Sequence, residues 1–82
     1  MKIFNISNPV AFFKRIQRCK GNVYSVDETG HQQDMKELAA ILNQSGMMKH
    51  IGAITEIDIV MESLDDVHTM LGFVYELCRN AA

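Results

Sequence analysis

The segment Ile6-Ser7-Asn8-Pro9 is where this sequence comes nearest to a chemical site. Asn8 is a good N-cap residue and Pro9 fits the first position of a helix, so we predict that a helix begins there. Because free amides and the positive end of the helix dipole attract anions, we predict an anion-binding site at Ser7 and Asn8. No base lies beside the Ser7 hydroxyl in this segment, so Ser7 is interpreted first as a competing cap.

Histidines and cysteines are the other residues that could do chemistry. The three histidines, His31, His50 and His68, lack the spacing of a metal site. Cys19 and Cys78 form no CxxC pair, and we expect buried thiols, with a bridge between the first and last helices left open. We therefore predict no metal, no cofactor and no catalytic residue, and we do not expect an enzyme.

The composition is that of one globular domain spanning residues 1–82, with 48% hydrophobic and 22% charged residues. A formal net charge of −2 gives no broad positive field, so nucleic acid is not an expected partner. No apolar run approaches the ~20 residues that span a bilayer. Lys14 and Arg15 interrupt the first apolar positions too early for a signal peptide, and we expect a cytoplasmic protein without membrane insertion.

Hydrophobic periodicity and turn residues predict four strands and three helices. The expected strands cover residues 2–6, 22–28, 31–34 and 56–62, and the expected helices cover residues 9 to about 19, 34–45 and 63–79. This order predicts an α+β open-faced sandwich, in which a four-stranded antiparallel sheet is covered on one face by three helices. The order of the strands within the sheet is left open.

Side-chain patterns predict which faces of these elements are buried. Ile57, Ile59 and Met61 alternate with charged residues, which is typical of a sheet covered on one side only. Polar residues in the third strand predict an exposed sheet edge. The residues expected on the buried side of the second and last helices are Leu38, Ile41, Leu42, Val67, Met70, Leu71, Val74, Leu77 and Cys78.

Several short motifs resemble those of HPr, the histidine-containing phosphocarrier protein of the bacterial sugar phosphotransferase system. Asn8-Pro9-Val10-Ala11 resembles the Arg-Pro-Ala-Ala start of that family's first helix, and Asn22-Val23-Tyr24 with the Gly30 turn resembles its second strand and hairpin. Asp34-Met35-Lys36-Glu37-Leu38 resembles the family's Asn-x-Lys-Ser-Ile segment. The resemblance covers nearly the whole chain and implies an HPr-like sandwich.

The same comparison indicates that this chain lacks the histidine that reacts in the HPr family. The phosphoacceptor histidine of HPr lies in a His-Ala-Arg-Pro motif, and Ile6-Ser7-Asn8-Pro9 stands in its place. Without an imidazole nucleophile and an arginine, we expect a regulatory or docking module that is not phosphorylated. The family's regulatory serine falls on Glu37, which either imitates the phosphorylated state or only completes a capping box with Asp34.

The resemblance also implies a partner surface on the first two helices and the loop that follows. Its predicted contact residues are Phe12, Arg15, Leu38, Met47 and Met48. The expected partner is a protein, either a phosphotransferase component or a transcriptional regulator. An alternative reading places the two methionines at the closing end of the core.

Two other functions stay open. A residual phosphocarrier would accept its phosphoryl group at Ser7 or His31. A small-ligand sensor of the ferredoxin-like or ACT-like type would bind a metabolite instead. The sequence does not indicate the oligomeric state.

Overall fold

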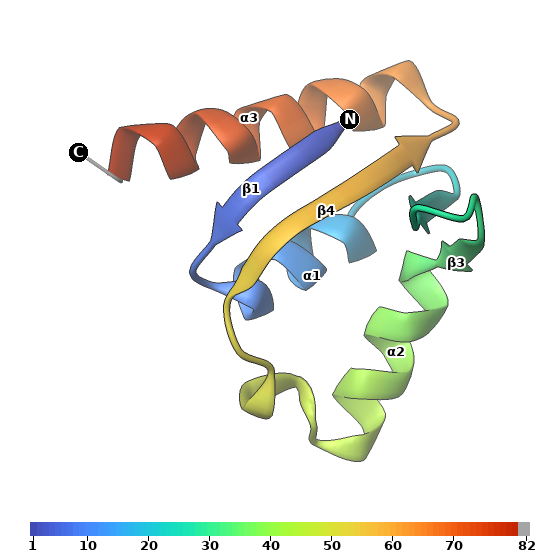
Figure 1. Ribbon diagram of the computed structural model, residues 1–82, viewed down its shortest axis with the longest axis vertical. Coiled ribbons are helices and arrows are strands. Elements are labelled where there is room, and N and C mark those ends of the chain that lie inside the picture. Colours follow the sequence, from blue (N-terminus) through green and yellow to red (C-terminus); the bar gives the residue numbers. More distant parts are fainter. Residues whose placement is uncertain (81–82) are drawn as a thin grey trace.

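A computed structural model describes residues 1–80 of the chain. Its antiparallel sheet has the strand order β1-β4-β2-β3. The strands are β1 (Lys2–Ile6), β2 (Val23–Val26), β3 (Gln32–Asp34) and β4 (Ile54–Met61). The helices are α1 (Pro9–Gln17), α2 (Met35–Ser45), the short 3₁₀ helix η1 (Met48–His50) and α3 (Leu64–Asn80) (Figure 1). The predicted α+β sandwich of a four-stranded antiparallel sheet and three helices is confirmed.

Local sequence signals set the helix ends. The Asn8 side chain accepts a hydrogen bond from the Ala11 amide at 3.2 Å, and a proline follows the cap, as predicted. Asp34 Oδ1 accepts from the amides of Lys36 and Glu37, at 3.0 and 3.1 Å. Helix α2 ends at Ser45, and Gly46 caps it with a left-handed φ of 72°, which suits glycine.

One face of the sheet is covered and the other is open, as the residues of the inner strand β4 and of β1 show. Ile59 is fully buried, whereas Val60 exposes 42% of its surface and Phe4 on β1 exposes 54%. This confirms the one-sided burial that the alternating pattern predicts. The polar strand β3 lies at the edge of the sheet, also as predicted.

The core lies between the covered face of the sheet and the helices. Phe12 of α1 packs edge-on to Phe13, with ring centroids 5.4 Å apart, and lies 5.8 Å from the ring of Phe73 on α3. The core residues are Ile3, Ile6, Phe12, Phe13, Ile16, Cys19, Val23, Met35, Ala39, Ile59, Met70 and Phe73. Helices α1 and α3 are thus joined through aromatic side chains.

The predicted buried side of the helices needs three corrections. Leu71 exposes 50% of its surface and Cys78 is also exposed, because the residues of α3 that face the core are Asp66, Met70 and Phe73. Ile41 of α2 exposes 53% of its surface for the same kind of reason, since Met35 and Ala39 occupy the buried side of that helix. Both cysteines are free thiols.

Candidate functional site

The turn between β1 and α1 forms a small pocket around the predicted anion site. Ser7 and Asn8 are exposed there and line a hollow of about 340 Å³. Asn5 precedes them with a φ of 57°, a left-handed conformation that asparagine tolerates better than most residues. The resulting twist of the strand lets Ile6 point into the core three residues after Ile3.

Among the described residues, none of those that line this pocket has a positively charged side chain. Glu76 of α3 contributes a carboxylate to its lining, and the side chains of Phe73 and Leu77 make much of the rest apolar. The Ala11 amide, which a bound anion would use, already donates to the Asn8 side chain. The structure therefore brings Ser7 and Asn8 together as predicted, but in surroundings that weaken the attraction of the helix start for an anion.

Arg15 was predicted to contact a partner from the first helix, and the structure places its side chain between α1 and α3. Its Nη2 atom lies 3.0 Å from Glu76 Oε2, and its Nη1 donates to the Thr69 carbonyl at 3.4 Å. The guanidinium also lies over the ring of Phe73, 5.7 Å from its centroid. Arg15 thus joins two helices of its own chain, and its charge is already paired.

The prediction that Phe12 contacts a partner also needs correction. Its side chain is fully buried, so it makes no direct contact with a partner. The reason is that Phe12 and Ile16 are one helical turn apart on the side of α1 that faces the core. Its predicted role as a surface contact is therefore wrong.

The remaining predicted contact residues, Leu38, Met47 and Met48, lie on α2 and in the segment that follows it, and we name the surface along these elements the α2–η1 face. It consists of Glu37, Leu38, Ile41, Met47 and Met48. Glu37 is exposed in the first turn of α2, and Ile41 follows it by one helical turn. Ile41 and Met47 expose 53% and 52% of their surfaces, whereas Leu38 and Met48 pack partly against the core.

Met47 and Met48 were predicted either to contact a partner or to close the end of the core, and the structure gives the two residues different surroundings. Met48 packs against the core with Ile51 and Ile54, so it closes that end of the molecule. Met47 follows the cap of α2, where its amide donates to the Leu42 carbonyl at 3.1 Å, and its side chain stays exposed. Sequence reasoning missed Ile41 as a surface residue because its spacing fits a buried stripe equally well.

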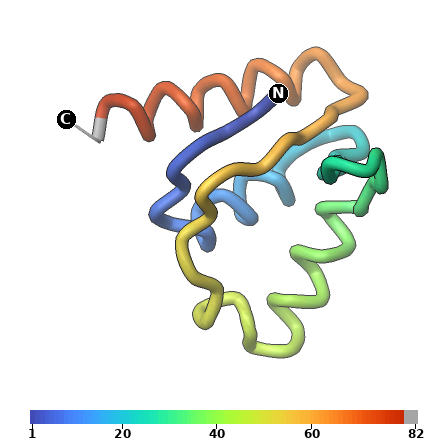
Figure 2. The backbone as a smooth tube through the Cα atoms, viewed as in Figure 1, coloured from blue at the N-terminus to red at the C-terminus, as the bar shows by residue number. Residues whose placement is uncertain are grey.

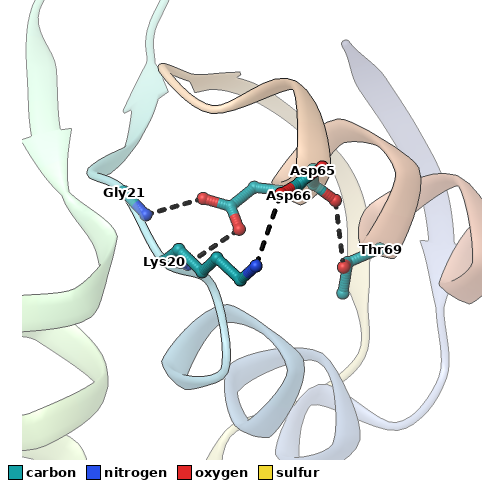
Figure 3. A network of polar contacts seen from close by, with 5 residues as sticks. All are labelled: Lys20, Gly21, Asp65, Asp66 and Thr69. Atoms are coloured by element: carbon teal, nitrogen blue, oxygen red, sulfur yellow. Dashed lines mark hydrogen bonds and ion pairs between the residues drawn. The ribbon is translucent and has the colours of Figure 1, made fainter.

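A polar network that the sequence analysis did not identify joins the start of α3 to the loop after α1. Asp66 exposes 2% of its surface, and its carboxylate accepts from the amides of Lys20 and Gly21 at 2.7 and 2.8 Å (Figure 3). Burial by itself would raise the pKa of Asp66. The two amide hydrogen bonds and the charges of Lys36 and Lys20 bring this pKa below its ordinary value. The network uses Asp66 as a structural acceptor.

Neighbouring Asp65 and Cys19 have different surroundings. Asp65 forms an exposed ion pair with Lys20, at 3.3 Å. Burial raises the pKa of the Cys19 thiol, and the nearby Asp66 carboxylate raises it further. A raised pKa keeps the Cys19 sulfur protonated and poorly nucleophilic.

His31 lies between β2 and β3, and β3 forms the edge of the sheet opposite to β1, the strand that leads into the turn containing Ser7. Its Nδ1 atom is 2.8 Å from Thr29 Oγ1, and its amide donates to Asp27 Oδ1 at 3.0 Å. The hydrogen bond from the Thr29 hydroxyl, followed by those from the turn amides, lowers the pKa of Asp27. These contacts stabilise the hairpin turn, and the two alternative phosphoacceptors do not share a site.

Residues 1–80 contain no group of three histidine, cysteine or acidic side chains that could hold a metal ion. Within the same part of the chain, no helix has the length and apolar character needed to cross a membrane. Comparisons with protein-family models, with curated proteins and with solved structures found no match for this chain.

Proposed function

We propose that this chain is an HPr-like docking module that binds a partner protein through the α2–η1 face and does not carry a phosphoryl group. The observation that carries the proposal is the exposure of two large apolar side chains, Ile41 and Met47, at 53% and 52%. Exposed apolar residues with a polar rim are typical of protein contacts. Glu37 provides such a rim on α2.

The α2–η1 face has the rigid support that a binding surface needs. Leu38 and Met48 pack partly against the core, so the segments that carry Ile41 and Met47 are anchored to it. Met47 lies beyond the end of α2 and has an unbranched, adaptable side chain. A preformed apolar surface with one adaptable residue suits a partner with an apolar patch of its own.

Glu37 gives the α2–η1 face a fixed negative charge. The first half of the predicted capping box is formed, since Asp34 accepts from the Glu37 amide at 3.1 Å. Among the described residues, the Glu37 carboxylate makes no return hydrogen bond to the Asp34 amide, so capping does not account for it. This supports the reading that Glu37 stands in for a phosphorylated regulatory serine and faces the partner.

The link to the phosphotransferase system is the second part of the proposal. It is supported by the motifs that resemble HPr and by the agreement between the observed sandwich and the one that the resemblance implies. Absence of the reactive imidazole from Ile6-Ser7-Asn8-Pro9 favours docking over transfer. The proposed partner is a component of that system, such as enzyme I, or a transcriptional regulator of the bacterial cytoplasm.

Titration calorimetry of the purified chain with enzyme I tests this proposal. The variant Met47→Asp places a charge in the α2–η1 face, and we expect binding to weaken at least ~10-fold because an apolar contact is replaced by an unpaired carboxylate. Leu71→Asp is the matched control, since Leu71 has a similar exposure of 50% but lies on α3. Equal binding by both variants and the unaltered chain would contradict the proposed surface.

A further inference from the structure

Helix α3 carries a second apolar stripe on the side that points away from the core. Leu64, Leu71 and Tyr75 expose 70%, 50% and 67% of their surfaces. With the exposed residues His68 and Cys78 they recur at alternating steps of four and three, the spacing of a helix that pairs with another helix. We name these five residues the outer stripe.

Packing within residues 1–80 does not account for the outer stripe. The core-facing side of α3 is formed by Asp66, Met70 and Phe73, which lie on the other side of the helix. A surface helix normally has polar residues opposite its buried side. Since three large apolar side chains stand there instead, the stripe indicates a contact outside the chain.

Gly72 lies beside the outer stripe in the middle of α3, and it points to the same conclusion. A helix with a glycine in its interior is less stable than the same helix with an alanine at that position. A Cβ atom added here would meet only the Arg15 Nη1 atom, at 3.9 Å, so the packing of the chain itself does not require glycine. A bare backbone at this position allows another helix to approach closely.

The charged residues that flank the outer stripe indicate that its partner is a second copy of α3. Asp65 precedes Gly72 by seven residues, and Arg79 follows it by seven. Two copies of α3 that run antiparallel and cross at Gly72 would place Asp65 of each copy opposite Arg79 of the other. Asp65 is 71% exposed even with its ion pair to Lys20, so it remains accessible to a second cation.

We infer that two copies of this chain form an antiparallel dimer through the outer stripes of their α3 helices. The two-fold axis passes near Leu71 and Gly72. Leu71 then meets Leu71 of the second copy, and His68 meets Tyr75 of the second copy, whose hydroxyl can hydrogen-bond to the imidazole. The antiparallel arrangement also pairs opposite ends of the helix dipoles. One helix per copy makes a small interface, and hence a weak, concentration-dependent dimer.

The dimer is independent of the proposed docking function. Helix α3 runs along the top of the view in Figure 2, whereas α2 begins lower down and ends, with η1, at the bottom. Pairing through the outer stripe therefore leaves both α2–η1 faces free. Failure of one proposal leaves the other standing.

Sedimentation velocity over a wide range of concentrations tests whether the dimer forms. We expect the average mass to rise from that of one chain toward that of two, and Leu71→Asp to abolish the rise. Ile41→Asp is the control, because Ile41 is equally exposed but lies on α2, and it should dimerise like the unaltered chain. A monomer at every concentration, or dimers that persist in Leu71→Asp, would overturn the inference.

Cysteine cross-linking tests the antiparallel orientation. Leu71→Cys combined with Cys78→Ser puts one thiol of each copy next to the two-fold axis, so mild oxidation should link most of the folded chains into dimers. In the unaltered chain the two Cys78 thiols lie at opposite ends of the interface and should remain reduced under the same conditions. Efficient linkage through Cys78 would show a parallel pair and overturn the proposed geometry, as would the failure of a folded Leu71→Cys variant to cross-link.

Discussion

Gly21 and Asp66, forty-five residues apart in the sequence, are joined by a hydrogen bond of 2.8 Å from the Gly21 amide to the Asp66 carboxylate. The second oxygen of the same carboxylate accepts from the Lys20 amide at 2.7 Å. A Cβ atom at Gly21 would lie 3.4 Å from both Asp66 Oδ2 and Ser63 Cβ, which is a tight fit. The small residue and the buried acid together fix the loop after α1 against the start of α3.

Replacing Asp66 by asparagine should destabilise the fold. The amide group of asparagine has one acceptor oxygen, so one of the two backbone amides loses its partner in a buried place. We expect the melting temperature to fall by ~5 °C or more. Thermal unfolding followed by circular dichroism measures this change. Glu62→Gln, on an exposed residue of the same region, is the control and should leave the melting temperature nearly unchanged.

The Asp66 carboxylate should also give stability an acid dependence. Its pKa is lowered in the folded chain from an ordinary value of 3.8, so the folded state favours the ionised form. The stabilisation is present above the unfolded pKa and is lost as the pH falls through the folded pKa. Urea unfolding across the acid range should therefore show a smaller loss of stability in Asp66→Asn than in the unaltered chain. Parallel curves for the two proteins would contradict this assignment.

Arg15 and Glu76 should show a measurable coupling in a double-mutant cycle. The two atoms Nη2 and Oε2 are 3.0 Å apart, and the arginine side chain is 23% exposed while the glutamate is 58% exposed. A pair this open to solvent contributes about 0.3–1 kcal/mol. Unfolding of Arg15→Met, Glu76→Gln and the double variant measures the coupling free energy. A value of zero would show that Arg15 acts through its contacts with the Thr69 carbonyl and the Phe73 ring, and that the ion pair adds nothing.

Gly72→Ala should separate chain stability from dimerisation. At low concentration we expect the variant to be more stable by about 0.5–1 kcal/mol, because alanine is the better helix former and its methyl group has room. At high concentration the same methyl group should hinder the approach of a second α3 helix and weaken the dimer. Chemical unfolding measures the change in stability, and sedimentation velocity measures the change in dimerisation.

Phe12→Ala distinguishes a core residue from a surface one. The side chain is fully buried against Phe13 and Phe73, so we expect a loss of about 3–5 kcal/mol of unfolding free energy. Met47→Ala is the comparison, since Met47 is 52% exposed and should change stability by less than ~0.5 kcal/mol. Equal losses in the two variants would contradict the placement of these residues.

Local signals in the sequence predicted most of the fold. Asn8 and Asp34 accept hydrogen bonds from amides two or three residues away, and Pro9 has a backbone angle that suits the first position of a helix, so their positions along the chain were enough to predict where α1 and α2 begin. The alternation around Ile59 predicted the one-sided sheet because the period of a strand is fixed by its backbone. These parts of the prediction depend on neighbours in sequence alone.

The errors came from contacts between distant segments. Arg15 was predicted to contact a partner, and the sequence did not indicate that its charge pairs with Glu76, sixty-one residues away. The two acids at the start of α3 fit the helix dipole equally well, and nothing local indicates that Asp66 is buried while Asp65 is exposed. In α3 a stripe of apolar residues was predicted to be buried, and only the packed structure separates the core side from the outer stripe.

The central claim, docking through the α2–η1 face without phosphoryl transfer, is tested most directly by following the nitrogen-15 spectrum of this chain. The spectrum is recorded while enzyme I and phosphoenolpyruvate are added. The account predicts that amide signals of residues 37–48 shift or broaden, whereas those of Ser7 and His31 keep their positions. An unchanged α2–η1 face, or new signals at Ser7 or His31 together with the added mass of a phosphoryl group, would contradict it.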